Sequence, residues 1–120
     1  MKIACTTSGT DLDAPLDKRF GRAPRFLIVD TETGSTELIE NTLNRNSAQG
    51  AGIQAATVLI NHEVNSLITG QCGPKAFELL KRSAIRVYPC QAETVAEALQ
   101  QLADSTLNET AAATVEGHWS

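Results

Sequence analysis

Four of the ten Lys and Arg residues in this 120-residue sequence fall within one eight-residue stretch, where their side chains could bind an anion. They are Lys18, Arg19, Arg22 and Arg25. In Arg19-Phe20-Gly21-Arg22 two guanidinium groups could approach one anion, because Gly21 permits a turn, while Phe20 anchors the loop or covers an apolar face of the ligand. The alternative is a solvated loop whose arginines pair with its own aspartates.

The basic stretch belongs to a long connection, residues 7–24, between two predicted strands. Loops of more than about 12 to 15 residues are uncommon in compact domains and are usually functional or disordered. Asp11, Asp13 and Asp17 in this loop could bind a hard cation, but they lack the glutamate and the register of an EF-hand. The length and the glycine and proline content therefore favour a shaped binding loop.

Two glycine-containing turns each precede a predicted helix. The first turn, Gly50-Ala51-Gly52, matches the start of the Gly-x-Gly-x-x-Ala dinucleotide-binding motif. However, no strand leads directly into it, and no acidic residue follows at the distance that the motif requires. The bare amides of such a helix start could still hold another anion. The second turn is Gly73-Pro74-Lys75. The charge of Lys75 lies beside the positive end of the predicted helix, which is unfavourable unless the side chain faces an anion or water.

Cys5, Cys72 and Cys90 form no Cys-x-x-Cys pair, so neither a disulfide framework nor a zinc knuckle is indicated. Each lies at or just after the C-terminal end of a strand expected to be parallel, and two or three of the thiolates could converge at that sheet edge on a soft metal. The more frequent role of free cysteines is that of small buried hydrophobes. Cys72 could instead be a reactive thiol at a helix start, and His62 is favoured as a partner of a helix dipole.

Apolar periodicity predicts five strands and three helices. The strands are expected over residues 2–6, 25–31, 36–43, 66–69 and 85–88. One helix follows a capping box at Asn46 and Gln49 and ends near Asn61, the next begins at Pro74, and a third carries Val95, Ala98 and Leu102. The turn at residues 33–35 makes the second and third strands an antiparallel hairpin, and the later alternation implies parallel pairing.

These elements predict an α/β domain with a mixed five-stranded sheet, its second strand antiparallel, over residues 1–105, followed by a tail over 106–120. The net charge of −4 argues against a nucleic-acid partner. Without a signal peptide or an apolar run long enough to span a bilayer, we expect a cytoplasmic protein with no membrane partner. Phosphate-loop, zinc-protease and nucleophile-elbow motifs are missing from the sequence, so we expect no enzyme.

The order of several short motifs resembles the dinitrogenase iron-molybdenum cofactor biosynthesis family. The resemblance covers residues 1–102 and rests on Met1-Lys2-Ile3-Ala4, Arg19-Phe20-Gly21-Arg22-Ala23-Pro24, residues 26–30, Gly50-Ala51-Gly52-Ile53, Gly73-Pro74-Lys75-Ala76-Phe77 and Ile85-Arg86-Val87-Tyr88. Within the family, the chain is most similar to small proteins of sulfate-reducing bacteria that carry a molybdenum-copper-sulfide cluster.

The resemblance implies a ribonuclease H-like three-layer fold and non-catalytic carriage of an anionic metal-sulfur cluster, of molybdenum-copper-sulfide or iron-molybdenum type, or its precursor. It implies delivery to a protein partner, with cluster contacts at Arg19, Phe20, Gly21, Arg22, Gly50, Gly52, Gly73 and Lys75. Cys72 departs from the family pattern, so its candidacy as a metal ligand rests on this sequence alone. The alternative function is a regulatory protein-interaction module without a bound cluster.

Overall fold

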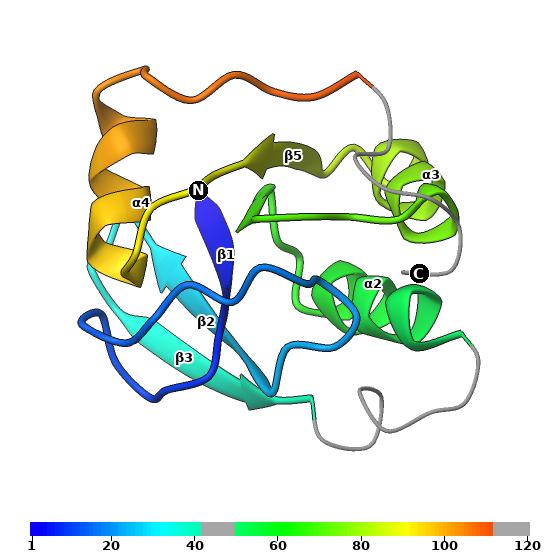
Figure 1. Ribbon diagram of the computed structural model, residues 1–120, viewed down its shortest axis with the longest axis horizontal. Helices are drawn as coiled ribbons and strands as arrows, with labels where there is room; N and C mark the ends of the chain where they lie inside the picture. The colour runs from blue at the N-terminus through cyan, green and yellow to red at the C-terminus, as the bar shows by residue number, and fades with distance from the viewer. Residues whose placement is uncertain (42–49, 112–120) are drawn as a thin grey trace.

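A computed structural model gives the fold, and it describes residues 1–41 and 50–111. The chain alternates strands and helices after an initial three-stranded meander (Figure 1). The elements are β1 (Lys2–Thr7), β2 (Arg25–Asp30), β3 (Thr36–Glu40), α2 (Ala51–Asn61), β4 (Ser66–Thr69), α3 (Pro74–Arg82), β5 (Arg86–Pro89) and α4 (Val95–Ala103). No helix among the described residues is long and apolar enough to cross a membrane.

The five strands form one mixed sheet in the order β3-β2-β1-β4-β5. β2 pairs antiparallel with both β1 and β3, whereas β1, β4 and β5 are mutually parallel. The predicted mixed sheet with its antiparallel second strand is therefore confirmed. Because β1, β4 and β5 run the same way, the loops that follow them lie at one edge of the sheet, which we call the carboxyl edge.

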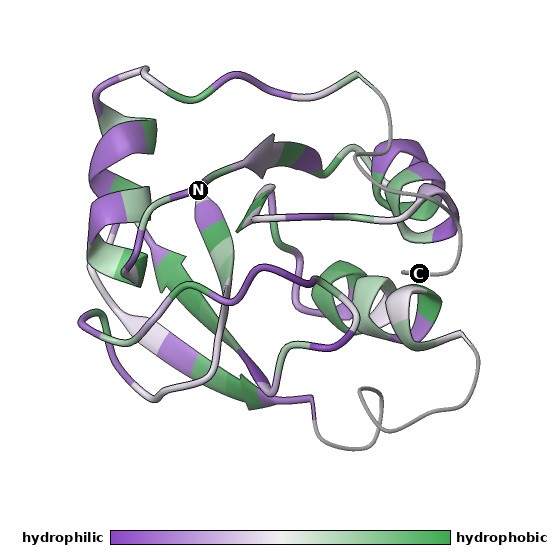
Figure 2. Ribbon diagram, in the orientation of Figure 1, coloured by the Kyte–Doolittle hydropathy of each residue, from purple (hydrophilic) through white to green (hydrophobic). Residues whose placement is uncertain are grey.

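Helices cover both faces of the sheet, with α2 and α3 on one side and α4 on the other (Figure 1). Successive residues of β1 point to opposite faces, so Ala4 packs with Leu67 and Leu80 under α2 and α3. Ile3 packs with Val95 under α4. Hydrophobic residues occupy the strands and the inward helix faces, while polar residues face outward (Figure 2).

Several boundaries differ from the predicted ones by a residue or two. β1 extends to Thr7, β2 ends at Asp30, and β5 is shifted by one residue, to Arg86–Pro89. β3 ends at Glu40, while the last two residues of the predicted strand, like Asn46 and Gln49 of the predicted capping box, lie outside the described residues. The predicted helix end at Asn61 is confirmed.

The described start of the C-terminal segment runs back along the sheet rather than away from it. The Thr110 amide donates to the Val87 carbonyl at 2.9 Å, and Leu107 packs against the core under α4. Arg86 and Glu109 form an exposed ion pair at 3.8 Å. Residues 106–111 thus shield the free edge of β5, a strand edge that would otherwise present unpaired backbone groups.

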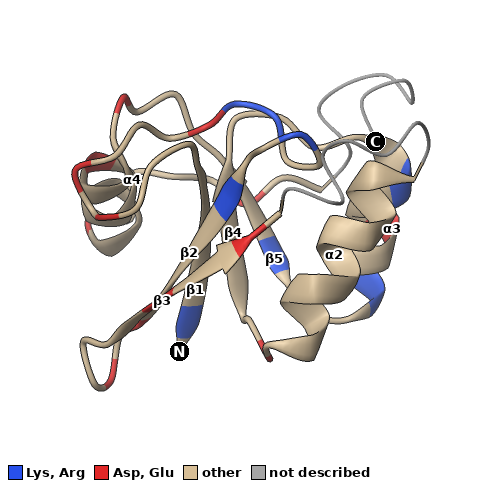
Figure 3. Cartoon of the chain, turned by 90° about the horizontal axis from the view of Figure 1, so that it is seen from below, with Lys and Arg blue, Asp and Glu red and all other residues tan. Residues whose placement is uncertain are grey.

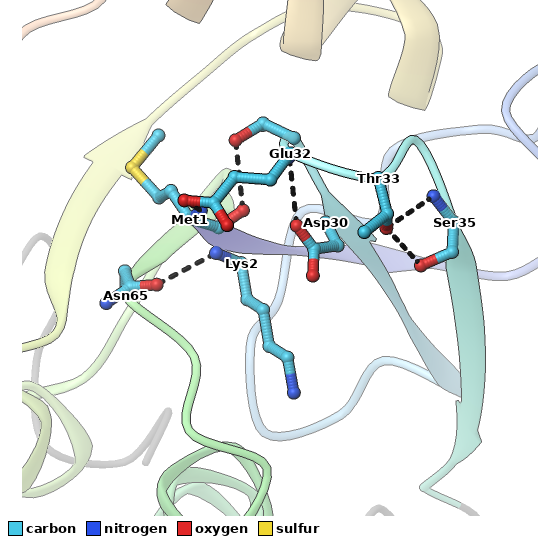
Figure 4. A network of polar contacts seen from close by, with 8 residues as sticks. Met1, Lys2, Asp30, Glu32, Thr33, Ser35 and Asn65 are labelled. Atoms are coloured by element: carbon cyan, nitrogen blue, oxygen red, sulfur yellow. Dashed lines mark hydrogen bonds and ion pairs between the residues drawn. The ribbon is translucent and has the colours of Figure 1, made fainter.

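The edge of the sheet opposite the carboxyl edge is closed by polar contacts (Figure 4). The Lys2 amide donates to Oδ1 of Asn65 at 2.8 Å, and the Glu32 amide donates to Oδ1 of Asp30 at 2.9 Å. The amino group of Met1 lies 3.7 Å from the Glu32 carboxylate. These contacts tie β1 to β2 and to the start of β4, far from the basic loop.

Candidate functional site

The long loop at residues 7–24 is ordered by backbone hydrogen bonds. Its first half packs on the start of α4, where the Leu16 amide donates to Glu93 and the Val95 amide donates to Ala14. The loop then crosses the carboxyl edge, where the Asp17 amide donates to the Thr6 carbonyl at 2.8 Å. The sequence indicated that this loop has a function, and its hydrogen bonds explain how so long a segment keeps one shape.

Two buried threonines hold the crossing point. Thr6, at the end of β1, donates through Oγ1 to the Asp17 carbonyl at 2.6 Å, and its Oγ1 lies 3.0 Å from that of Thr69 in β4. Next to them, Gly70 leaves room for the loop, because a Cβ there would lie 2.7 Å from Cα of Lys18. The loop backbone therefore rests directly on the ends of two parallel strands.

Phe20 fixes the centre of the basic segment. Its side chain is 2% exposed, and its ring centroid lies 5.6 Å from that of Phe26 in the core. The Phe20 amide also donates to the Gln71 carbonyl at 3.1 Å. Of the two roles considered for Phe20, the structure supports that of anchor, because a buried ring presents no face to a ligand.

Gly21 brings the loop against the first turn of α2. A Cβ on Gly21 would lie 2.8 Å from the amide nitrogen of Gly52 and 2.9 Å from its Cα, so no larger residue fits without displacing backbone. Gly50 precedes the helix in the left-handed conformation, with φ of 75°. Two of the predicted segments, Arg19-Phe20-Gly21-Arg22 and Gly50-Ala51-Gly52, therefore touch.

The third predicted segment, Gly73-Pro74-Lys75, lies on the same side of the carboxyl edge. Gln71 bridges to Arg19 through the backbone, and Gly73 then caps α3 with Pro74 in its first turn. Lys75 is exposed in that turn. The loop thus contacts the start of α2 and the turn that leads into α3. We call these segments together the basic site. Its members are the exposed Lys18, Arg19 and Lys75, the half-buried Arg22 and Gly50, and the buried Gly21, Gly52 and Gly73.

The charges of the basic site are only partly compensated by carboxylates. Lys18, Arg19 and Lys75 are exposed and form no ion pair within the described residues. The Asp17 carboxylate accepts the Arg19 backbone amide at 2.9 Å, not its guanidinium. The guanidinium of Arg25 pairs with Glu40 in the neighbouring strand at 2.7 Å. Pairing of Arg19 with the loop's own aspartates is therefore not what the structure adopts.

Helix capping separates the carboxyl edge into two electrostatic halves. Thr94 caps α4 by accepting the Glu97 amide at 3.2 Å, and Glu97 places an acid in the first turn. Neither α2 nor α3 has a side-chain cap or an acid in its first turn. Figure 3 shows basic residues of the loop on the side of α2 and α3, and acidic residues gathered around α4. The positive ends of two helix dipoles therefore lie beside the loop cations.

Asn41 is a residue of this region that sequence reasoning missed. It follows β3, is 1% exposed, and its Nδ2 donates to the carbonyls of Ala23 at 2.8 Å and Gly21 at 3.4 Å. Its backbone amide donates to the Pro24 carbonyl at 2.8 Å. An asparagine after a strand ordinarily indicates a turn, so the sequence offered no signal that this side chain holds a loop.

The three cysteines do not all meet, although Cys5 and Cys90 lie in the same cluster and close enough for their charges to interact. Cys5 and Cys90 are buried under α4, whereas Cys72 is buried on the other face of the sheet. Burial raises the pKa of the Cys5 thiol to about 12, with a smaller contribution from the charge of Cys90, and burial raises the pKa of Cys72 to about 12. Among the described residues no group of three His, Cys, Asp or Glu side chains could hold a metal ion. Cys72 as a metal ligand stays a prediction.

His62 has the role that its sequence position favoured. It is the C-cap of α2, and its Nδ1 lies 2.8 Å from the Val58 carbonyl in the last turn. Its Nε2 lies 3.9 Å from the Glu37 carboxylate on β3. His62 is therefore occupied at the end of α2 opposite the basic site.

Two large hollows lie outside the basic site. A hollow of about 730 Å³ lies at the opposite edge beside Met1, Asn65 and Tyr88, and one of about 590 Å³ lies along the outer face of α3 beside Phe77. The basic site is distinguished instead by charge, by two helix starts without side-chain caps and by the close packing of its backbone.

Comparison with known proteins gives a consistent family. The family model for dinitrogenase iron-molybdenum cofactor matches residues 1–105. An uncharacterized protein of Methanocaldococcus jannaschii is 34% identical over 97 residues, which make up 78% of this chain and 81% of that protein. The predicted family resemblance is confirmed.

Two solved structures are similar over nearly their whole length. The apo form of the orange protein from Desulfovibrio gigas has 37% identity and a TM-score of 0.92, over 95% of this chain and 96% of that protein. A NifB-like protein from Thermotoga has 36% identity and a TM-score of 0.85, over 97% and 98% respectively. The chain is thus homologous to both proteins and has the same mixed α/β fold.

Proposed function

Because the chain belongs to the dinitrogenase iron-molybdenum cofactor family, we propose that it binds an anionic metal-sulfur cluster, or a precursor of one, without catalysing a reaction. The expected cargo is a molybdenum-copper-sulfide or iron-molybdenum cluster, which the protein carries to a partner in the cytoplasm. The family and the homology to the orange protein support metal-sulfur chemistry. We also infer a ribonuclease H-like fold, which the strand order and the antiparallel β2 support.

The observation that carries this proposal is the gathering of cations and uncapped helix starts on one side of the carboxyl edge. Lys18, Arg19 and Lys75 lack carboxylate partners within the described residues, and α2 and α3 begin beside them without side-chain caps. Guanidinium groups and helix-start amides are the donors that proteins use for multiply charged anions. This side of the edge is built to attract negative charge.

The cluster would be held by hydrogen bonds and charge rather than by bonds from protein ligands to metal. The described part of the chain brings no three metal-ligating side chains together. The raised pKa of Cys72 keeps it a neutral thiol near pH 7, which also opposes its use as a nucleophile. A cluster that carries its own sulfide ligands needs only such an outer shell of donors.

The proposal is tested by reconstitution. The purified apoprotein is incubated with tetrathiomolybdate and a copper salt, desalted, and examined by visible absorption and metal analysis. We expect a protein-bound visible band with molybdenum and copper in the protein fraction, and no band with molybdate in place of tetrathiomolybdate. A colourless, metal-free protein after desalting would reject cluster carriage and leave the interaction module as the better description.

A further inference from the structure

We propose that Asn41 is a positioning residue of the basic site, which fixes the backbone on both sides of Arg22 and so directs its guanidinium group toward the ligand. This inference rests on the proposed anion binding at that site. Asn41 itself is buried, at 1% exposure, and need not touch the ligand. Its role would be to keep Arg22 in a binding position before the ligand arrives.

The hydrogen bonds of Asn41 bracket Arg22. The amide nitrogen Nδ2 donates to the carbonyl of Gly21, which precedes Arg22, and to that of Ala23, which follows it, at 3.4 and 2.8 Å. The backbone amide of Asn41 adds a bond to the Pro24 carbonyl at 2.8 Å. The Gly21–Arg22 and Ala23–Pro24 peptide planes are thereby held, which limits the rotation of the backbone between them.

The side-chain amide is the feature that this arrangement requires. Nδ2 carries two hydrogens and can serve two carbonyl acceptors at once, which neither a hydroxyl nor a carboxylate of similar size can do. Because the site is buried, water cannot replace a lost donor without a change in packing. Substitution of Asn41 should therefore loosen the segment around Arg22 even where the core remains folded.

The same bonds also set the distance between Arg22 and the start of α2. Gly21 packs directly on Gly52, where a Cβ would lie 2.8 Å from the Gly52 amide nitrogen. Asn41 holds the carbonyl of the same glycine, so its hydrogen bond helps to keep Gly21 in this contact. Release of Gly21 would loosen the contact between the loop backbone and the start of α2, and with it the position of the Arg22 backbone relative to that helix.

A double-mutant cycle tests this role. The variants are Asn41→Leu, an uncharged residue of similar size, Arg22→Ala, and the two together, with uptake of tetrathiomolybdate and copper as the readout. We expect each single variant to weaken binding about tenfold and the double variant to bind no more weakly than Arg22→Ala, because Asn41 acts through Arg22. Losses that add independently would overturn the proposal. Asn41→Ser, which keeps one donor, should show a smaller loss and replaces Asn41→Leu if that variant does not fold.

A second readout separates this inference from the proposed function. Backbone ¹⁵N relaxation of the unliganded protein should give Arg22 an order parameter near the rigid value of about 0.85, falling below about 0.6 in the Asn41 variants. Asn65→Leu, which removes an asparagine at the opposite edge, should leave Arg22 rigid. If wild-type protein takes up no probe, the proposed function fails, and an unchanged order parameter in the Asn41 variants would then refute the positioning role by itself.

Discussion

The arginines of the basic loop have different surroundings. Arg19 is exposed, while Arg22 is half-buried between Gly21 and Ala23, whose carbonyls Asn41 binds. A partly buried guanidinium is less screened by water and salt than an exposed one, so its contribution to anion binding should be the larger. Arg25, in the same eight-residue stretch, is already paired with Glu40 and has a structural role.

Removal of both loop arginines should weaken cluster uptake. Arg19→Ala with Arg22→Ala deletes two charge-assisted donors, and we expect a loss of about 10- to 100-fold in affinity, since each factor of ten corresponds to about 1.4 kcal/mol. The matched control is Lys2→Ala with Arg86→Ala, which removes two cations at the opposite edge of the sheet. Equal losses in both double variants, measured by titration with tetrathiomolybdate and copper, would show that only net charge matters.

The buried thiols give the protein a stability that depends on pH. Burial raises the pKa of Cys5 and of Cys72 from 9.0 to about 12, so the unfolded chain loses these protons first as pH rises. The contribution of both thiols is complete below pH 9 and is lost between pH 9 and 12, with a slope of at most about 1.4 kcal/mol per pH unit for each thiol.

Urea unfolding between pH 8 and 10.5 measures this effect. The free energy of unfolding of the wild type should fall with pH more steeply than that of a Cys5→Ala and Cys72→Ala variant. Parallel pH profiles for the two proteins would contradict the buried placement of the thiols.

At the scale of the elements, the start of each helix decides which half of the carboxyl edge attracts an anion. α4 is capped by Thr94 and has Glu97 in its first turn, whereas Gly50 and Gly73 offer no side chain to α2 and α3. Each uncapped helix start stabilises a nearby anion by about 0.3 to 1 kcal/mol at the surface. Two other glycines, Gly21 and Gly70, let the loop backbone approach the start of α2 and the end of β4 closely.

Gly21 should tolerate no side chain. In Gly21→Ala the new Cβ meets the backbone of Gly52 at 2.8 Å, and such overpacking typically costs about 1 to 3 kcal/mol. We expect lower stability and weaker cluster uptake, measured by thermal unfolding and titration. Gly34→Ala is the control, because that turn has open space around it and only its positive φ is strained. Uptake as strong in Gly21→Ala as in Gly34→Ala would contradict the contact between loop and helix.

Sequence reasoning succeeded where a local pattern determines the outcome. The apolar run at residues 26–29 and the spacing of Val95, Ala98 and Leu102 predicted β2 and α4, and the pairing directions followed from the order of elements. It could not foresee contacts between segments distant in sequence. The approach of Gly21 to Gly52 and the reach of Asn41 to Ala23 depend on how the loop lies across the finished sheet.

For the candidate site, too, the sequence predicted individual segments but not the contacts between them. Arg19, Gly52 and Lys75 were each proposed from their own segments, and the structure places those segments at one side of the carboxyl edge. The burial of Phe20 and the separation of the cysteines onto two faces could not be read from the sequence. Both depend on which face of the sheet each residue meets.

The whole molecule carries a net charge of −4, yet its carboxyl edge is divided into a basic half beside α2 and α3 and an acidic half beside α4. This division would attract an anionic cluster to one half and repel it from the other. It would also leave the acidic half available to contact a molecule other than the cluster. The net charge alone does not reveal this asymmetry.

Cluster uptake should therefore weaken as salt increases. The Debye length falls from about 10 Å at 0.1 M to about 3 Å at 1 M ionic strength, which screens exposed Lys18, Arg19 and Lys75 from the ligand. Titrations with tetrathiomolybdate and copper across this range should show progressive loss of affinity in the wild type and a smaller salt effect in the Arg19→Ala and Arg22→Ala double variant. Affinity that is independent of salt would indicate direct metal ligation instead.

The central claim is tested most directly by the metal content of the protein purified from its native host, since another expression host could lack the cluster. Anaerobic purification followed by elemental and acid-labile sulfide analysis should find molybdenum or iron together with sulfide, co-eluting with the protein and released by high salt. Protein that is metal-free and sulfide-free under these conditions would contradict cluster carriage.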